Sequence, residues 1–558
     1  MCLALCQINS IAGNVDANLA KILGAIELAS RNPKNRILIF PELALPGACA
    51  GDLLLNDLFL ESCEDALTKI DTKCRDLKIS AIIGTISPAS DNKRKNSLCI
   101  VGPHGGAHFD KVKLTSEDVS DEYRYFKPDE ILNCIWLCPD SGQNYAIAHW
   151  SDRQLLKRES FPSHKVDRII LVGACAFEVG APAGILAELR EIARTINVPV
   201  AFVNAVGAGD HIVYAGGSTI VMPNGTVPVM GKWFAEDMID WSVDGKYTKD
   251  LYPAEDDLIM DPVRSTIEAL TLGLKDYMDK CGFKRVLIGN SGGIDSAVAV
   301  TLSVRALGAE NVITVSMPGP FTTDGTRMDS DELADNLGIT QMYIPIAPAY
   351  EVFNQMMLND NERGPLKKLF GGDKQKVSKL AGENLQARLR GVILMWISNA
   401  LGSAEPTLLL ATGNKSEAAV GYTTLYGDTC GGLCLLGDLT KDMVYKVAAE
   451  LNRQMGPVIP ESVIKRAPSA ELAPGQKDQD TLPPYPILDK LIEGLLVQGD
   501  APQDLIDEKQ SITKELAERV VKMMRRAEYK RKQFAPNIRV TSKAFGFGHR
   551  MPSATGKN

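Results

Sequence analysis

The sequence has 558 residues, of which 45% are hydrophobic and 23% charged, and its formal net charge at pH 7 is −8. The length indicates more than one domain, because a single domain rarely exceeds roughly 250 residues, and the composition is typical of soluble globular proteins. The acidic balance argues against nucleic acid or an anionic membrane surface as a partner, and no apolar run approaches the roughly 20 residues that span a bilayer.

The first nine residues, Met-Cys-Leu-Ala-Leu-Cys-Gln-Ile-Asn, contain no basic residue and no long apolar core. They therefore predict a first strand and not a signal peptide. The 12 cysteines are scattered along the chain without the spacing of a zinc site. Without a secretory signal, we expect reduced thiols in a cytoplasmic protein.

Short strands and helices alternate over residues 1–245. Helices are predicted at 15–30, 57–77 and 183–197 from apolar residues at helical spacing. The Asn-Gly pair at 224–225 predicts a hairpin. The predicted strands are 2–8, 36–40, 80–86, 98–101, 145–149, 168–172, 198–204 and 217–222. This alternation is typical of an α/β sandwich.

A polar stretch at 246–262 contains two prolines and predicts a linker, so a second domain is expected at 263–558. Its predicted elements are helix 263–281, strand 286–289, a helix ending at 307, strand 312–317, helix 326–337 and strand 340–346. Strands that alternate with helices of this length predict a doubly wound parallel sheet. The basic segment 367–379 is only weakly periodic and predicts a mobile loop.

The most informative motif follows the first strand of this second domain. Its six residues open an apolar helix and read Ser291, Gly292, Gly293, Ile294, Asp295 and Ser296. Glycines let the backbone approach a ligand, and the first N–H groups of a helix carry the positive end of its dipole, so this turn predicts an anion site. No Gly-Lys-Ser/Thr follows, which excludes a Walker A loop. The motif resembles the pyrophosphate-binding loop of enzymes that split ATP into AMP and pyrophosphate; the alternative is a Gly-rich surface turn.

Further motifs lie downstream in the same domain. Residues 382–391 open a helix on which Asn384 and Arg388, one turn apart, share a face. The apolar residues predicted to form its buried stripe are Leu385, Leu389, Val392, Ile393 and Trp396. The other motifs are Thr-Gly-Asn-Lys-Ser-Glu at 412–417, Tyr-Thr-Thr-Leu-Tyr-Gly-Asp at 422–428, Asp-Leu-Thr-Lys at 438–441, Pro-Ser-Ala-Glu-Leu at 468–472 and Tyr-Lys-Arg-Lys-Gln at 529–533. Together they resemble the synthetase domain of NAD synthetases, over nearly all of 263–552.

The resemblance implies a two-step reaction. ATP adenylates the nicotinate carboxylate of deamido-NAD, and pyrophosphate leaves. Ammonia then attacks the mixed anhydride to give NAD and AMP. Adenylation is needed because a carboxylate is a poor electrophile, and the departing pyrophosphate requires charge neutralisation from the 291–296 loop and a magnesium ion.

The same resemblance assigns roles to individual side chains. Asp295 and Glu417 match the family motif as Mg²⁺ ligands, which suits an ion that takes one or two carboxylates plus phosphate oxygens. Thr412 and Lys441 match residues that contact ATP. The deamido-NAD side is expected to comprise Asn384, Glu417, Asp428 and Lys530. Arg388 is a further candidate, since a guanidinium can pair with phosphate or carboxylate bidentately.

The first domain resembles the nitrilase-type glutaminase that is fused to some NAD synthetases. The residues that carry this likeness are Ile-Phe-Pro-Glu-Leu-Ala-Leu-Pro-Gly at 39–47, Lys-Val-Lys-Leu at 111–114, Asp-Glu-Tyr-Arg-Tyr-Phe at 121–126 and Val-Asn-Ala-Val-Gly at 203–207. That family uses a Glu as general base, a Lys that stabilises the tetrahedral intermediate and a Cys nucleophile. Glu42 and Lys111 match the first two roles.

The nucleophile is missing from its expected place. The stretch 145–152 reads Tyr-Ala-Ile-Ala-His-Trp-Ser-Asp, so Ala148, His149 or Trp150 occupies the position of the Cys. None of these replaces a thiolate in attack on an amide carbon. We therefore predict a glutaminase domain without amidase activity, with ammonia as the direct nitrogen donor.

Several alternatives stay open at this point. Cys175 or Cys138 could substitute for the missing thiol, and Glu42 and Lys111 are then either relics or members of a structural ion pair. Another amidotransferase with a pyrophosphate loop is a second possibility, and a nucleotide-sensing or scaffold protein is a third. The resemblance implies a homo-oligomer, a dimer of synthetase domains or larger.

Overall fold

The computed structural model describes residues 2–32, 35–89, 93–117, 120–161, 166–242, 258–359, 361–402 and 404–554. The chain forms two compact units, Met1–Ser265 and Thr266–Asn558. Most of the predicted linker, residues 246–257, lies outside the described residues. No helix in the described ranges is long and apolar enough to cross a membrane.

The first unit is built on two six-stranded sheets. The first sheet has the order β16-β1-β2-β3-β4-β5, and the second has the order β15-β14-β11-β10-β9-β8. The strands of the first are β1 (Cys2–Gln7), β2 (Asn35–Ile39), β3 (Ser80–Pro88), β4 (Arg94–Val101), β5 (His108–Asp110) and β16 (Asp237–Ser242). Those of the second are β8 (Ile135–Cys138), β9 (Gln143–His149), β10 (Arg168–Gly173), β11 (Val200–Asn204), β14 (Thr219–Val221) and β15 (Val229–Met230). Strands β14 and β15 form the hairpin that Asn-Gly predicted.

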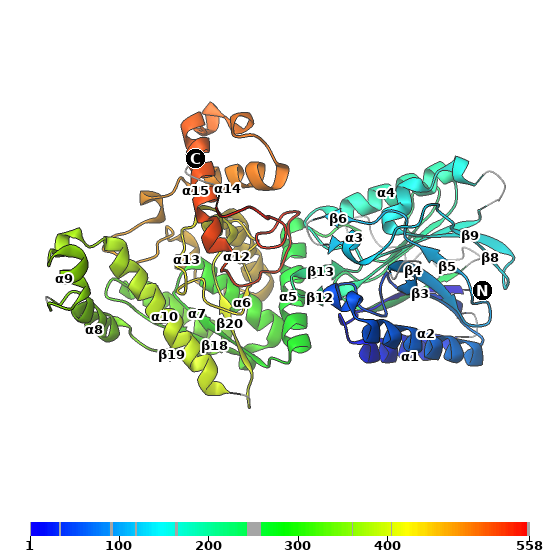
Figure 1. Ribbon diagram of the computed structural model, residues 1–558, viewed down its shortest axis with the longest axis horizontal. Helices are drawn as coiled ribbons and strands as arrows, with labels where there is room; N and C mark the ends of the chain where they lie inside the picture. Colours follow the sequence, from blue (N-terminus) through cyan, green and yellow to red (C-terminus); the bar gives the residue numbers. More distant parts are fainter. Residues whose placement is uncertain are drawn as a thin grey trace. The chain divides into compact units, whose positions relative to one another are not determined.

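Helices cover the outer faces of both sheets. Helices α1 (Val15–Ser30) and α2 (Asp57–Leu77) lie side by side against the first sheet, and α4 (Ala181–Ile196) packs on the second (Figure 1). Both faces of the strands are therefore buried, as β1 shows: Leu3 and Leu5 enter the core between the sheets, and Ala4 and Cys6 enter the core under α1 and α2. The predicted α/β sandwich is confirmed.

The smaller elements of this unit are connections at the strand ends. They are β6 (Ser116–Glu117), β7 (Ser120–Asp121), α3 (Glu122–Tyr125), β12 (Val206–Gly209) and β13 (Ile212–Ala215).

The second unit contains one parallel sheet with the order β19-β18-β17-β20-β21. The strands are β17 (Arg285–Gly289), β18 (Val312–Ser316), β19 (Thr340–Tyr343), β20 (Thr407–Ala411) and β21 (Leu433–Cys434). The first strand in the chain, β17, is central, and later strands add on both sides of it, so the sheet is doubly wound as predicted. Ligands bind at the carboxyl ends of such strands, which is where the Ser-Gly-Gly turn follows β17.

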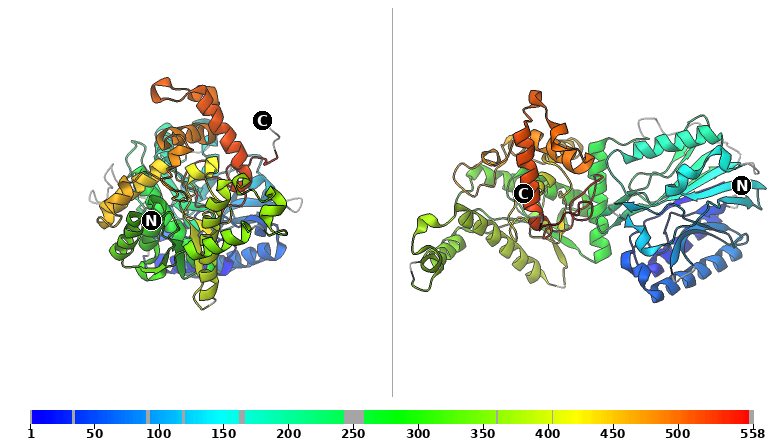
Figure 2. Two further views of the ribbon diagram at one scale, coloured as in Figure 1. Left: turned by 90° about the vertical axis from the view of Figure 1, so that its left-hand side faces the viewer. Right: turned by 45° about the horizontal axis from the view of Figure 1, so that its top comes forward.

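Helices surround this sheet. They are α5 (Pro262–Cys281), α6 (Ile294–Leu307), α7 (Asp324–Leu337), α8 (Ala347–Met357), α9 (Pro365–Phe370), α10 (Lys379–Leu401), α11 (Lys415–Val420), α12 (Lys441–Met455), α13 (Glu461–Lys465), α14 (Tyr485–Ile492) and α15 (Lys514–Arg531). Figure 2 shows α8 and α9, in green, at the periphery of this unit and away from the sheet. Part of the segment predicted as a mobile loop is instead helical: α9 begins at Pro365, which favours a first helical turn, and Gly371, in a left-handed conformation, caps its end.

The predicted buried stripe of the helix that became α10 is wrong in two positions. Val392 and Trp396 are 66% and 70% exposed, whereas Leu389, Leu394 and Ile397 are buried. The buried residues of α10 also include Gln386, Ala387 and Gly391. These residues are polar or small, so a search for large apolar residues at helical spacing does not find them. On the other side of α10, Val392, Met395 and Trp396 are exposed.

Candidate functional site

The Ser-Gly-Gly turn forms a tight polar loop between β17 and α6. Ser291 Oγ lies 3.0 Å from Ser296 Oγ and accepts from Gly293 N at 3.3 Å, while Ser296 Oγ donates to Gly293 O at 3.0 Å. Ile294 is the first residue of α6, and Asp295 lies in its first turn. The loop thus presents hydroxyl groups and the amino end of a buried helix, which together suit an anion.

Glycine is required at one position of this loop. Gly292 has φ +75°, and a Cβ added there would lie 2.1 Å from the carbonyl oxygen of Thr326 in α7. A side chain is excluded by the clash and by the left-handed backbone. The close approach of α7 therefore fixes the path of the loop.

A lysine and two carboxylates meet beside the loop. Lys441 Nζ lies 2.6 Å from Asp295 Oδ2 and 3.1 Å from Glu417 Oε1. These residues come from three segments that are far apart in sequence: the starts of α6, α11 and α12. The sequence-predicted residues Asp295, Glu417 and Lys441 therefore form one charged cluster.

Local sequence explains how Glu417 and Lys441 are held. Asn414 caps α11 in a capping box with Glu417, and its Nδ2 also donates to Asp295 Oδ1 at 2.8 Å. Thr440 caps α12, so Lys441 is the first residue of that helix. Asn414 is a site residue that the sequence analysis missed; the Asn-x-x-Glu spacing of a capping box was the available signal.

The electrostatics of the cluster favour an additional cation. Burial raises the pKa of Glu417 to about 7, which the Lys441 ammonium opposes and the Asp295 carboxylate reinforces. Burial lowers the pKa of Lys441, but the two carboxylates outweigh burial and hold that pKa above its usual range. A single ammonium thus leaves the pair of acids short of positive charge. Two carboxylates beside an anion loop fit a Mg²⁺ ion that also binds phosphate oxygens, although no cage of three or more His, Cys, Asp or Glu side chains occurs among the described residues.

A second group of predicted residues surrounds the loop between α11 and β21. Lys530 Nζ donates to the carbonyl oxygens of Gly421 and Thr423 at 2.8 and 2.7 Å. Asp428 Oδ1 accepts from Thr424 N at 2.6 Å. The two remaining contacts are Thr424 Oγ1 with Asn384 Oδ1 at 2.8 Å and Arg388 Nε with Leu425 O at 3.2 Å. The structure therefore brings Asn384, Arg388, Asp428 and Lys530 to one loop. Thr412 follows β20, two residues before Asn414.

A cavity of about 670 Å³ lies between Asn414 and the 421–428 loop. Its wall includes Asn414, which contacts Asp295, and Thr423 and Asp428 from the loop. The far side is formed by the carboxy-terminal segment, including Phe534, Phe545, Phe547, His549 and Arg550. Asp428 lines this cavity, and burial raises the pKa of its carboxyl to about 6, which the backbone N–H of Thr424 and the Lys530 ammonium oppose.

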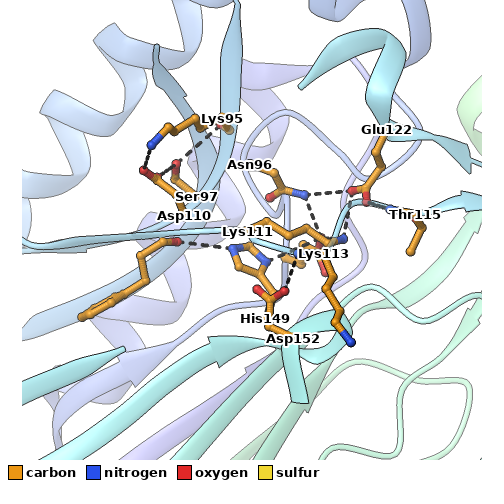
Figure 3. A network of polar contacts seen from close by, with 12 residues as sticks. Lys95, Asn96, Ser97, Asp110, Lys111, Lys113, Thr115, Glu122, His149 and Asp152 are labelled. Carbon is orange, nitrogen blue, oxygen red and sulfur yellow. Dashed lines mark hydrogen bonds and ion pairs between the residues drawn. The ribbon is translucent and has the colours of Figure 1, made fainter. Parts of the chain in front are cut away.

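The first unit contains a separate buried polar network. Lys111 Nζ lies 2.7 Å from Glu42 Oε1 and 2.9 Å from Glu122 Oε1. Asn96 Nδ2 donates to the same two oxygens, at 2.7 and 3.1 Å. Figure 3 shows Lys111, Asn96 and Glu122 directed toward one another, with His149 alongside. Glu122, in α3, is a network residue that the sequence analysis did not identify.

Among the three candidates for the nucleophile position, His149 is the side chain that faces this network. Its Nδ1 lies 3.6 Å from Glu42 Oε1, and its Nε2 lies 3.3 Å from the carbonyl oxygen of Phe109. Ala148 points to the α4 side of the sheet, and Trp150 packs there against Phe202. Asp152 accepts from the backbone N–H groups of Val112 and Lys113. Of the three side chains, His149 is therefore the one directed toward Glu42.

Charge within the network stabilises the carboxylate. Burial raises the pKa of Glu42, but the Lys111 ammonium and the His149 side chain outweigh burial and hold that pKa below its usual range. Burial likewise lowers the pKa of Lys111, and the charges of Glu42 and Glu122 raise it above its usual range.

Neither alternative cysteine is suited to replace the nucleophile. Cys138 pairs with Gln143 at the start of β9, and six residues of strand, roughly 20 Å, separate that point from His149. Cys175 packs on the α4 side, and burial, followed by the charge of Glu42, raises the pKa of its thiol to about 12. In the part of the chain that the structure describes, no thiol is hydrogen-bonded to Glu42 or Lys111.

Comparison with known proteins identifies both units. The carbon-nitrogen hydrolase family matches residues 2–143, up to the first residue of β9, and the NAD synthase family matches residues 266–534. Glutamine-dependent NAD(+) synthetases of Synechocystis sp. and Aquifex aeolicus are each 34% identical to this chain, over 99% of it and 98% of their own length.

Solved structures agree with these relatives over the whole length. A glutamine-dependent NAD+ synthetase from Acinetobacter baumannii in complex with ADP is 30% identical, with a TM-score of 0.74 and coverage of 100% of this chain and 98% of that one. A glutamine-dependent NAD(+) synthetase from Cytophaga hutchinsonii, 19% identical, shares the fold with a TM-score of 0.81 and the same coverage. The chain therefore belongs to the glutamine-dependent NAD(+) synthetase family.

Proposed function

We propose that the second unit converts deamido-NAD to NAD with ATP and ammonia. The carboxylate of the nicotinate ring attacks the α-phosphate of ATP, and the bond to pyrophosphate breaks. Ammonia then attacks the acyl-adenylate, AMP leaves, and the nitrogen loses a proton. The observation that carries this proposal is the Asp295–Lys441–Glu417 cluster beside the 291–296 loop, which offers fixed charge where pyrophosphate departs.

The residues divide into two groups in this reaction. Ser291, Gly292, Gly293 and Ser296 hold the departing phosphates, with Thr412 and Lys441 on the ATP side. Asp295 and Glu417 would hold a Mg²⁺ ion, which neutralises phosphate charge when bound. The 421–428 loop, with Asn384, Arg388, Asp428 and Lys530 around it, takes deamido-NAD; the cavity that reaches from Asp428 to Asn414 supports this arrangement.

We further propose that ammonia is used directly and that the first unit has lost its glutaminase activity. The relatives named above are glutamine-dependent, but here His149 faces Glu42 and Lys111 where a thiol is needed. Glutamine hydrolysis at this site would require a nucleophile that can bond to the amide carbon. Free ammonia must then come from solution or from a separate protein.

The test is NAD formation from deamido-NAD, ATP and magnesium with either ammonium chloride or glutamine. We expect stoichiometric release of AMP and pyrophosphate with ammonium and no product with glutamine. Equal rates with both donors would contradict the loss of glutaminase activity. If no NAD forms with ammonium chloride and none forms with glutamine, the synthetase assignment is contradicted.

We also propose that the active form is a homo-oligomer in which a second copy covers the exposed side of α10. Val392, Met395 and Trp396 are exposed there, and the neighbouring α8 exposes Phe353 and Met356. So many large apolar side chains on one part of the surface are typical of a protein interface.

A further inference from the structure

A buried ion pair joins the two segments that carry Glu417 and Lys441. Lys415 Nζ lies 2.8 Å from Asp438 Oδ1, and neither side chain is accessible to solvent. Lys415 precedes Glu417 by two residues, and Asp438 precedes Lys441 by three. The pair is reinforced by a backbone hydrogen bond from Lys415 N to Leu439 O at 2.8 Å.

The same pair holds a third segment, at the carboxy-terminal end of the chain. Asp438 Oδ2 accepts from the backbone N–H groups of Val540 and Thr541 at 2.8 and 2.7 Å. Lys415 Nζ also donates to Thr541 Oγ1 and to Lys543 O, both at 2.8 Å. All three protons of the ammonium and both oxygens of the carboxylate are therefore used, which is the condition for a buried ion pair to be tolerated.

A second contact between the segments that carry Glu417 and Lys441 depends on the position of Lys415 relative to Asp438. Ser416 lies between Lys415 and Glu417, and its Oγ accepts from Lys441 N at 2.9 Å. The Ser416 hydroxyl in turn donates to Asp489, whose other oxygen accepts from Asp442 N at 2.9 Å. A shift of Lys415 relative to Asp438 would therefore move Glu417 away from Lys441.

We propose that Lys415 and Asp438 are positioning residues of the synthetase site, and that segment 538–543 is the third part of the frame that they hold. The inference rests on the proposed function for its kinetic consequences. Lys415 and Asp438 are too deeply buried to touch substrate; they act by fixing the distance between Lys441 and Glu417. The carboxy-terminal segment belongs to this frame because its continuation, from Phe545 to Pro552, forms a wall of the cavity next to Asn414.

The alternative is an ion pair that stabilises the fold and nothing more. The two interpretations predict different values of kcat for a variant that is folded. If the pair only stabilises, a variant assayed well below its melting temperature has a normal kcat. If it positions Glu417 and Lys441, kcat falls although the protein is folded, because misplacement of catalytic groups by about 1 Å costs roughly a hundredfold.

The experiment compares three full-length variants with wild type. D438N removes the charge of the carboxylate, and T541V removes only one hydroxyl, so T541V stays informative if D438N does not fold. E268Q is the matched control: Glu268 pairs with Arg305 in the last turn of α6, at the end opposite to the pyrophosphate loop. Steady-state kinetics with ammonium chloride and hydrogen–deuterium exchange of the same preparations are measured at a temperature at which each variant is folded.

We expect kcat to fall about a hundredfold in D438N and about tenfold in T541V, with little change in the KM values, and to be unchanged in E268Q. In D438N, exchange should quicken together in 538–543, in α11 and in the first turn of α12. A normal kcat in folded D438N, or faster exchange confined to 538–543, would overturn the proposal. If wild type itself makes no NAD, the proposed function is wrong, and the exchange pattern still decides whether the three segments are coupled.

Discussion

The Nδ1 atom of His149 lies 3.6 Å from Glu42 Oε1, and both side chains are buried between the two sheets of the first unit. The opposite ring nitrogen, Nε2, lies next to the carbonyl oxygen of Phe109, which can only accept a hydrogen bond. Nε2 therefore carries a proton, and the imidazole is fixed in place with Nδ1 toward the carboxylate. His149 thus joins the buried polar network that Lys111 forms with Glu42 and Glu122.

The first prediction concerns the two residues, Cys175 and His149, that could take the place of the missing nucleophile. We expect C175S and H149A to leave the ammonium-dependent rate unchanged and glutamine to remain inactive in both variants. Cys175 packs on the α4 side, where burial raises the pKa of its thiol to about 12, and the Nε2 atom of His149 is engaged with the carbonyl oxygen of Phe109. The measurement is NAD formation with each nitrogen donor. Glutamine-dependent activity in wild type that C175S abolishes would show that Cys175 is the nucleophile.

The second prediction is that E42Q destabilises the first unit in a pH-dependent way. Replacing Glu42 leaves Lys111 with Glu122 as its remaining carboxylate, and loss of a partner for a buried charge costs about 1–3 kcal/mol of the free energy of unfolding. The pKa of Glu42 is held below its ordinary value of 4.5, so its contribution is complete above that pH and is lost as the pH falls further.

Thermal unfolding of wild type and E42Q between pH 3 and pH 8 checks this prediction. The difference should be largest at neutral pH and should narrow below the ordinary glutamate pKa of 4.5. E61Q is the control, because Glu61 is an exposed residue of α2 in the same unit. A difference that grows as the pH falls would contradict the prediction.

The third prediction is that D295N abolishes synthesis without unfolding the chain. Asp295 contacts both Lys441 and Asn414, and we assign it to the metal. Loss of its charge should lower kcat by at least about a hundredfold, as removal of a preorganised electrostatic group does. Pyrophosphate release is the readout, with D324N as the control, because Asp324 is an exposed residue in the first turn of α7. A rate within a few fold of wild type would exclude Asp295 from the reaction.

The fourth prediction is that G292A prevents ATP binding. The added Cβ would lie 2.1 Å from Thr326 O, and φ at this residue is +75°. The loop must therefore move away from α7, which displaces the hydroxyl groups of Ser291 and Ser296. Calorimetric titration with ATP and magnesium measures the effect. G24A is the control: nothing lies within 4 Å of a Cβ at Gly24 in α1, so the change should leave binding intact. Wild-type affinity in G292A would show that ATP binds elsewhere.

The sequence predicted the central part of the second unit well because several signals agree there. An apolar strand, a Gly-rich turn and an apolar helix follow one another in β17, the loop and α6, and Asp295 and Glu417 each lie in the first turn of a helix that follows a buried strand. The sequence does not indicate which segments that are far apart in the chain come into contact in the fold. The contact of Asn414 with Asp295, and the ion pair of Lys415 with Asp438, depend on tertiary packing.

In the first unit the sequence left three candidates for the nucleophile position, and strand periodicity distinguishes them. Tyr145 and Ile147 lie in the core between the sheets, and Ala146 and Ala148 lie on the α4 side. Alternation therefore places His149 toward Glu42. For α10, by contrast, periodicity was not sufficient, as the exposed Val392 and Trp396 show. Helical periodicity identifies an apolar face but does not tell whether the same chain or another chain covers it.

The last prediction concerns that face. We expect the wild-type chain to be at least a dimer in solution, because Trp396 on α10 is 70% exposed and shares its surface with Val392. W396E places a charge in the proposed interface and should shift the protein toward monomers, with little loss of thermal stability because the side chain is uncovered within one chain. Sedimentation velocity measures the change. L58E, at a 76% exposed residue of α2 in the first unit, is the control and should leave the assembly intact. A monomeric wild type, or a W396E variant that assembles normally, would show that this side of α10 does not join two copies.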